Sequence, residues 1–158
     1  MTRELEHSLI RVDENADWFY EGSRIFRPEI LESFYEKLEL LPSGEYVLAE
    51  ATVRCLLEVA DTPFVITRVD VEGDASGGER IVLGLKNLPG SERLDPGTLR
   101  SGKDNVLYCR IRNGRFPARF SRPAYYQFAA FIGEDESGLG FFFQLNGERH
   151  PIQMDGTT

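Results

Sequence analysis

Five arginines stand close together in a stretch of the chain that has no acidic residue. The stretch covers residues 105–133, and its arginines are Arg110, Arg112, Arg115, Arg119 and Arg122. A guanidinium group is always charged and offers a planar fork of donors, so several of them together suit a phosphate or a carboxylate. The stretch carries +5 although the whole chain carries −8, which leaves −13 for the remainder. The first hypothesis is therefore an anion-binding site in this stretch.

The turn at Asn113-Gly114 predicts which of these side chains share a surface. Asn-Gly between two strand-like runs, residues 106–112 and 115–120, is typical of a two-residue type I′ hairpin. Residues directly opposite each other in such a hairpin share a face. The expected opposite pairs are Tyr108 with Arg119, Arg110 with Pro117, and Arg112 with Arg115. These residues form a face that is basic and aromatic.

The alternate residues of the same hairpin predict how it is attached to the protein. They are apolar and form a face for the core: Leu107, Cys109, Ile111, Phe116, Ala118 and Phe120. Pro117 cannot donate a backbone hydrogen bond, which predicts that its strand lies at an edge or contains a bulge. The hairpin is therefore expected to present its arginines away from the core.

A predicted helix over residues 123–132 adds Arg122 to this surface. Arg122 precedes Pro123 at the helix start, where the helix dipole favours an anion and no neighbouring acid compensates the arginine. Arg27 stands likewise before Pro28 but has Glu29 beside it. We predict a ligand-binding site whose residues are Arg119, Arg122, Arg110 and Tyr108.

Two structural interpretations of the same arginines stay open. The hairpin face could be solvated and pair with carboxylates such as Glu50 or Glu58. Arg27 and Arg122 could instead each form a salt bridge to the other half of the protein. Both interpretations explain the arginines without a ligand.

Catalytic and metal chemistry find little support in the sequence. His7 and His150 are isolated, and no Ser/His/Asp or Cys/His arrangement can be assembled. The acids Asp70, Glu72 and Asp74 alternate but lack the remainder of a calcium loop, and no phosphate loop or dinucleotide motif is present. We predict no catalytic residue, no metal and no cofactor.

Composition predicts a small globular protein of the cytoplasm. The chain has 158 residues, 41% of them apolar, without a run long enough to cross a membrane or an N-terminal secretion signal. A charge of −8 argues against binding to extended nucleic acid. Cys55 and Cys109 lie in separate apolar runs, which predicts buried, reduced thiols.

Further elements are predicted from periodicity and turn residues. Apolar residues at helical spacing predict a helix from Pro28 to about Leu41. The strand-like runs are residues 10–12, 18–20, 24–26, 46–50, 53–59, 64–71, 80–85, 141–145 and 148–152. A second Asn-Gly turn, Asn146-Gly147, joins the last two. A loop is expected at residues 73–78 and a connection rich in Pro and Gly up to Gly102.

Two segments of the chain look alike. Arg24-Ile-Phe-Arg27-Pro28 is followed by a helix, Ser43-Gly44 and strands, and Arg119-Phe-Ser-Arg122-Pro123 is followed by a helix, Ser137-Gly138 and strands. This agreement predicts an internal repeat.

Three stretches resemble a bacterial family of unknown function. They are Trp18-Phe-Tyr-Glu-Gly22-Ser-Arg24-Ile-Phe-Arg27, Glu58-Val-Ala-Asp61-Thr-Pro63-Phe64, and residues 106–126. Ala60 differs from that family, which usually has an acid there. Residues 55–65 and 107–128 also resemble, more faintly, a small uncharacterised mitochondrial protein family. The bacterial resemblance implies a duplicated α+β fold and a nucleotide-like ligand in a cleft between the repeats, and it implies no reaction.

Together these observations predict an α+β fold of two repeated β-hairpin and helix units, mostly antiparallel, with two main helices. The expected subdomains are residues 10–85 and 103–154, joined by residues 86–102. The expected function is a non-catalytic ligand-binding or signalling module for an anionic small molecule or nucleotide near the repeat interface. The alternatives are a protein-interaction module that uses the basic face, and an enzyme on a phosphorylated small molecule with a carboxylate such as Asp61 as its base.

Overall fold

Both α-helices begin at the proline-containing segments that the sequence marks. Helix α1 spans Pro28–Lys37 and helix α2 spans Arg122–Ala129. Proline is favourable there because its fixed φ suits the first turn and its missing N–H would have no helical partner. Each helix buries two residues spaced by four: Leu31 and Tyr35 in α1, and Ala124 and Phe128 in α2. Helix α1 ends before the predicted Leu41, and the next residues form a strand.

The computed structural model describes residues 4–50, 52–138 and 140–154. Its secondary structure is mostly β with two α-helices, so the α+β class is confirmed. The chain divides into two compact units, unit 1 (Met1–Pro63) and unit 2 (Phe64–Thr158). No helix among the described residues has the length and apolar character that crossing a membrane requires.

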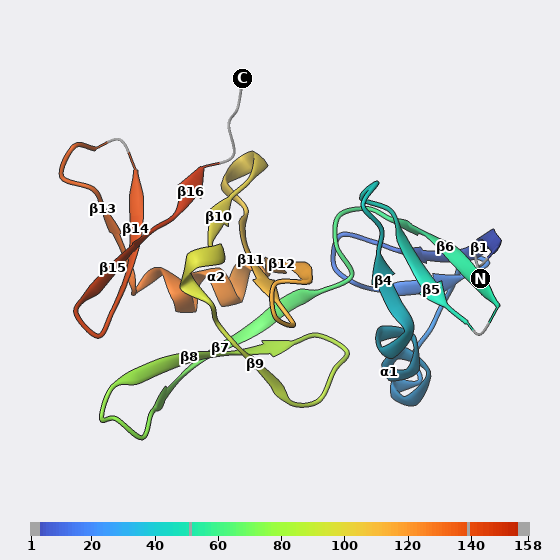
Figure 1. Cartoon of the computed structure of the whole chain (residues 1–158), viewed down its shortest axis with the longest axis horizontal. Helices are drawn as coiled ribbons and strands as arrows, with labels where there is room; N and C mark the ends of the chain where they lie inside the picture. The colour runs from blue at the N-terminus through green and yellow to red at the C-terminus, as the bar shows by residue number, and fades with distance from the viewer. Residues whose placement is uncertain (1–3, 51, 139, 155–158) are drawn as a thin grey trace. The chain divides into compact units, whose positions relative to one another are not determined.

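Unit 1 is built on one sheet. Its strands are β1 (Glu4–Val12), β2 (Trp18–Tyr20), β3 (Ser23–Arg24), β4 (Leu38–Leu40), β5 (Tyr46–Ala49) and β6 (Val53–Val59). The order across the sheet is β3-β2-β1-β6-β5-β4, and only the β1–β6 pair is parallel (Figure 1). The β2–β3 hairpin before α1 and the β4–β5–β6 meander after it thus belong to one continuous sheet.

Unit 2 contains two sheets. The first has the order β16-β10-β11-β12-β7-β8-β9, and the second has the order β13-β14-β15. Their strands are β7 (Val65–Gly73), β8 (Glu79–Leu85), β9 (Ser91–Arg93), β10 (Arg100–Ser101), β11 (Leu107–Ile111), β12 (Phe116–Phe120), β13 (Ile132–Glu134), β14 (Phe141–Leu145), β15 (Glu148–Pro151) and β16 (Gln153–Met154). Two short 3-10 helices, η1 (Pro96–Thr98) and η2 (Lys103–Asn105), flank β10. The β7–β8 hairpin (Figure 1) is bonded near its end to the β14–β15 turn, where Glu79 N donates to Asn146 Oδ1 (2.9 Å).

The division of the chain differs from the predicted subdomains. Strands β7 and β8 fall within the predicted first subdomain, residues 10–85, yet they pair with β12 and β9 in unit 2. The predicted connecting segment, residues 86–102, contains β9, η1 and β10, so it is part of the sheet. The boundary lies at Pro63 because the parallel β7–β12 pairing ties the following strands to the second half.

The predicted repeat is not confirmed by the sheet topology. Each unit has a hairpin, a helix and a three-stranded meander in that order along the chain. In unit 1 the meander joins the hairpin's sheet through the parallel β1–β6 pair, whereas in unit 2 the meander forms a sheet of its own. The likeness therefore extends to the order of elements, and the strand partners differ.

The two units have chemically different aromatic cores. In unit 1 the Trp18 ring packs against Phe34 and Tyr35, with centroids 5.6 and 5.2 Å away. Trp18 Nε1 donates to the Tyr35 hydroxyl (3.1 Å), which donates to the Pro63 carbonyl (2.6 Å). In unit 2 the core is a cluster of phenylalanines around Phe128, whose ring stacks on Phe143 at 4.9 Å. The core of unit 1 therefore combines ring packing with hydrogen bonds donated by Trp18 and Tyr35. The phenylalanine rings in unit 2 have no group that donates a hydrogen bond.

Candidate functional site

The β11–β12 hairpin has the predicted register along its strands. Tyr108 lies opposite Arg119, and Arg110 lies opposite Pro117. The six residues predicted to form the core face are all buried, none more than 4% exposed: Leu107, Cys109, Ile111, Phe116, Ala118 and Phe120. The hairpin is therefore attached to the core by the face that the alternation predicts, and its other face carries Tyr108 and Arg119.

The turn of this hairpin differs from the prediction. Strand pairing ends at Ile111 and Phe116, and Arg112 joins Asn113 and Gly114 in the left-handed region, with φ of 52°, 60° and 80°. Arg112 and Arg115 are consequently turn residues rather than an opposed pair on the strand face. The Arg112 guanidinium lies 5.2 Å from the Phe64 ring and 3.7 Å from the Glu92 carboxylate, contacts that hold it away from the strand ladder.

Pro117 lies in an inner strand with a regular β11–β12 register, so it is neither in an edge strand nor at a bulge as predicted. Strand β12 pairs with β7 only from Arg119 onward, where Arg119 N donates to Phe64 O (3.0 Å) and Ser121 N donates to Ile66 O (2.9 Å). These N–H groups and the Pro117 nitrogen point to the same side of β12, since they are two residues apart. The proline is tolerated because pairing on that side begins after it.

A third residue, Arg100, lies in line with the predicted pair. Strand β10 places Arg100 opposite Tyr108, so Arg100, Tyr108 and Arg119 follow one another across three neighbouring strands. The Arg100 guanidinium lies over the Tyr108 ring, 4.7 Å from its centroid. All three residues are half-buried. We call them the Arg100–Tyr108–Arg119 row; it places Tyr108 between two arginines, one on each neighbouring strand.

The sequence did not indicate Arg100 because it lies in the segment predicted to be a connection. Strand β10 has only two residues, too few for a visible alternation. The one usable signal in the sequence was the apolar Leu99 directly before the basic Arg100. In the structure Leu99 lies in the core and is 1% exposed.

The other two predicted ligand residues are not members of the row. Arg110 is exposed on the same face as Tyr108, but its Nη1 donates to the Gly114 carbonyl at the hairpin turn (2.9 Å). Arg122 is exposed and is the first residue of α2. Arg110 is therefore engaged with its own turn, and Arg122 lies three residues beyond the row along the chain.

The start of α2 offers fewer anion-binding donors than expected. Ser121 is the N-cap, and its hydroxyl accepts a hydrogen bond from Ala124 N (3.3 Å). Tyr125 N donates to Ser121 O (2.8 Å), and Pro123 has no N–H. An anion at this end would thus be bound chiefly by the arginine side chains rather than by the helix backbone.

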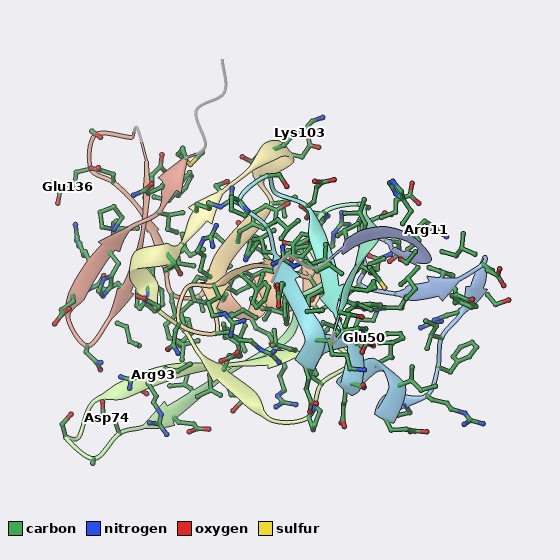
Figure 2. All side chains as sticks on the ribbon, turned by 45° about the vertical axis from the view of Figure 1, so that its right-hand side comes forward. Arg11, Glu50, Asp74, Arg93, Lys103 and Glu136 are labelled. Atoms are coloured by element: carbon green, nitrogen blue, oxygen red, sulfur yellow. The ribbon has the colours of Figure 1, made fainter. Side chains whose placement is uncertain are left out.

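The acidic residues of the β7–β8 hairpin pair locally. Asp74, at the hairpin tip (Figure 2), accepts hydrogen bonds from Ser76 Oγ (2.6 Å) and from the backbone N–H groups of Ser76 and Gly78. These bonds, that of the Ser76 side chain first, lower the pKa of the Asp74 carboxyl. Asp70 and Glu72 form ion pairs with Arg68 and Arg80. Within the described ranges, no group of three His, Cys, Asp or Glu side chains could hold a metal ion.

The two cysteines differ in environment. Cys109 is 1% exposed, as predicted, and burial raises the pKa of its thiol to about 12, with smaller contributions from the charges of Glu92 and Asp95. Cys55 is half-buried rather than buried, because its strand, β6, has intermediate exposure over most of its length. Both thiols are free.

Comparison with known proteins shows the fold. A scan of family models and a search of curated proteins find no match. Two crystal structures of bacterial proteins described as DUF1285 family proteins are similar, each 19% identical in sequence. The one from Silicibacter pomeroyi DSS-3 has a TM-score of 0.76 and matches 96% of this chain and 84% of its own. The one from Shewanella baltica OS155 has a TM-score of 0.63 and matches 78% of this chain and 91% of its own. The chain therefore has the fold of bacterial domains of unknown function.

Proposed function

We propose that unit 2 is a non-catalytic ligand-binding or signalling module that binds an anionic small molecule, of the nucleotide class, on the Arg100–Tyr108–Arg119 row. The observation that carries this proposal is the register of β10, β11 and β12. It puts one arginine on each side of Tyr108, Arg100 on β10 and Arg119 on β12. A guanidinium fork fits the oxygens of a phosphate, and an aromatic ring beside a guanidinium plane fits a base attached to it. Arg122, exposed at the start of α2, adds a further cation to the site.

The chemistry of the row favours binding over catalysis. The residues in line across β16, β10, β11, β12 and β7 are Gln153, Arg100, Tyr108, Arg119 and Val65. None of them is a carboxylate, a histidine or a cysteine, the commonest general bases and nucleophiles. The proposal therefore assigns recognition to these residues and no proton transfer.

We further propose that the chain is a divergent member of the DUF1285 family. The common fold and the two motifs around Trp18 and residues 106–126 support this assignment. The order of hairpin, helix and meander in both units also supports descent from a duplicated ancestor. The fainter likeness to a mitochondrial family stays a prediction.

A thermal-shift experiment tests the proposed site. The unfolding midpoint of the full chain is measured with adenosine and guanosine phosphates and with inorganic phosphate. A ligand at ten times its Kd stabilises the native state by about 1.4 kcal/mol, which raises the Tm of a chain of this size by roughly 3–6 °C. We expect this rise in the wild type and its loss in Arg119→Ala and Arg100→Ala, with a partial loss in Arg122→Ala.

Arg115→Ala is the matched control. It removes the same charge from the turn of the same hairpin, where the Arg115 guanidinium lies 5.1 Å from the Phe116 ring, outside the row. Its ligand response should equal that of the wild type. If no anion stabilises the wild type, and if Arg119→Ala and Arg122→Ala lower the unliganded Tm severely, both arginines are parts of the fold and the proposal fails. Binding of an acidic protein that survives excess nucleotide would instead favour the interaction module.

A further inference from the structure

Unit 2 contains a concave surface on the opposite side of β10 and β11 from the row. Ser101 and Leu107 pair with each other and directly adjoin Arg100 and Tyr108, so their side chains point to the other face of the sheet. They line a pocket of about 230 Å³. The pocket is therefore separated from the proposed anion site by the thickness of the sheet.

The pocket lies between the two sheets of unit 2. One wall is a row across three strands of the larger sheet: Met154, Ser101 and Leu107. The other wall belongs to the smaller sheet and its continuation: Ile132, Phe141 and Ile152. Tyr125 of α2 and Asn105 of η2 complete the lining. Two sheets and a helix thus build it, which makes it a feature of the unit 2 architecture.

Burial changes from one end of this pocket to the other. Leu107 and Ile152 are 4% and 7% exposed and form its inner part, whereas Tyr125, Phe141 and Met154 are 37%, 46% and 50% exposed. Among the described residues of unit 2, five large apolar side chains are exposed, and three of them line this opening. An apolar surface that is concave and open at one end is typical of a small-molecule site.

The lining specifies the chemistry of the occupant. None of the eight described lining residues carries a charge, although 28% of the chain is charged, so a buried ionic group would find no partner there. Two aromatic rings, those of Tyr125 and Phe141, and the thioether of Met154 favour contact with a flat ring. Ser101 and Asn105 can form hydrogen bonds to a hydroxyl or amide. The volume exceeds the ~150 Å³ cavity that accommodates benzene and is below the ~300 Å³ of the smallest drug-sized sites.

We propose that this pocket binds the flat ring of a small, uncharged molecule that has one hydrogen-bonding group. The ring lies between Tyr125 and Phe141, with Met154 at its edge, and the polar group lies toward Ser101 and Asn105. This inference is independent of the proposed anion site, because the two surfaces are on opposite faces of β10 and β11 and take ligands of opposite character.

Methyl NMR with 2-naphthol as the probe tests this site. The chain has two methionines, and a Met154→Leu variant identifies the Met154 signal in protein labelled with 13C at the methionine methyl groups. We expect a saturable shift of the Met154 methyl signal with 2-naphthol. Naphthalene-2-carboxylate, which has the same ring and a charge, should bind at least tenfold more weakly because the lining offers no cation.

Two variants localise the binding. Phe141→Ala removes one ring face of the lining and should weaken 2-naphthol binding about two- to tenfold. Val71→Ala is the control, since Val71 is 41% exposed on β7 and does not line the pocket; its affinity should be unchanged.

A linear, non-saturating shift, equal binding of the carboxylate, or equal affinity of Phe141→Ala and Val71→Ala would overturn the proposal. So would a Met154 signal that moves with protein concentration alone, because a second copy of the chain would then occupy the pocket. None of these results depends on the nucleotide panel, so the failure of one site leaves the other standing.

Discussion

Units 1 and 2 start a helix with the same five-residue pattern, but the strands after that helix form different sheets. After α1 the meander β4–β5–β6 continues the sheet of its own hairpin, because β6 pairs with β1. After α2 the meander β13–β14–β15 pairs only within itself, and the hairpin strand β12 pairs with β7. The comparison shows that a local signal can define the start of a helix while distant strands decide the sheet.

The number of sheets in each unit also bears on where a ligand could bind. Unit 1 has one sheet among its described strands, so it has no space between two sheets. Unit 2 has two sheets, and the space between them provides the pocket near Tyr125 while the outer face of the larger sheet carries Arg100 and Arg119. Both proposed sites therefore belong to the unit whose meander forms its own sheet.

The largest expected difference between the units is the reactivity of their thiols. At pH 8 a thiol-specific dye should label half-buried Cys55 first. Native Cys109 should react ~10³-fold more slowly than Cys109 in denaturant, because its pKa rises from 9.0 to about 12 and the reactive thiolate fraction falls accordingly. Mass spectrometry of digested protein follows each site. Fast labelling of native Cys109 would show that the core under β11 opens.

The same thiol predicts a pH dependence. The folded-state pKa of Cys109 lies above the unfolded value, so its contribution to stability is fully present below pH 9 and is lost as pH rises toward 12. Denaturation at several pH values should show this decline in the wild type and a smaller one in Cys109→Ala. Equal slopes in both proteins would contradict a buried, neutral thiol.

Truncation of the two aromatic cores should have unequal effects. Phe128 is 0% exposed, and its ring packs against Phe120, Phe143 and Phe131, so Phe128→Ala should lower the free energy of unfolding by about 3–5 kcal/mol. Phe34 is half-buried against Trp18, so Phe34→Ala should lower it by only about 1.5–2.5 kcal/mol. Chemical denaturation measures both; equal losses would mean that unit 2 is packed no more tightly than unit 1.

The hydrogen-bonded core of unit 1 predicts a smaller, more specific effect. Tyr35→Phe keeps the ring but leaves the buried Trp18 Nε1–H and the Pro63 carbonyl without this hydroxyl, which should lower stability by about 1–3 kcal/mol. Trp18 is the only tryptophan, so its fluorescence reports unit 1 directly. Tyr126→Phe, on a 66% exposed side chain of unit 2, is the control and should have no effect. A neutral Tyr35→Phe would show that water replaces the hydroxyl.

Local sequence signals predicted much of this structure. The strands Trp18–Tyr20, Val53–Val59 and Phe141–Leu145 and the start of α1 agree with their predicted bounds, because the strands are apolar runs next to turn residues and the helix begins at a proline. Strands β10 and β13 were missed: β10 lies in the segment predicted as a connection, β13 begins where the second helix was predicted to end, and neither is long enough to show a period.

Long-range pairing and side-chain contacts could not be predicted in the same way. The parallel β7–β12 pair joins residues more than fifty positions apart, and no turn specifies it. For the candidate site, the hairpin register gave Tyr108 and Arg119, whereas the addition of Arg100 depends on the pairing of the two-residue strand β10 with β11, which the predicted connection did not indicate. Arg110 lies on the predicted face, but its guanidinium adopts a rotamer that no spacing indicates.

The smallest expected effect concerns the caps of the two helices. Ser121 caps α2 through its hydroxyl, so Ser121→Ala should destabilise the protein by about 1 kcal/mol. Arg27 occupies the equivalent place in α1 with extended backbone (φ −70°, ψ 118°) and no side-chain cap. Because this backbone suits a capping residue, Arg27→Ser should stabilise the protein by about 0.5–1 kcal/mol.

Arg27→Ala separates the cap from the charge. Removing a cation from the positive end of the α1 dipole is itself mildly favourable, by about 0.3–1 kcal/mol at low salt, and this gain should shrink as salt is added. The gain from the serine hydroxyl over alanine should persist at high salt, since a hydrogen bond to a backbone N–H is not an interaction between exposed charges. Trp18 fluorescence during denaturation monitors unit 1 in both variants. If Arg27→Ser and Arg27→Ala are equally stable at high salt, the start of α1 does not accept a cap, and the likeness between the two helices ends at their shared proline.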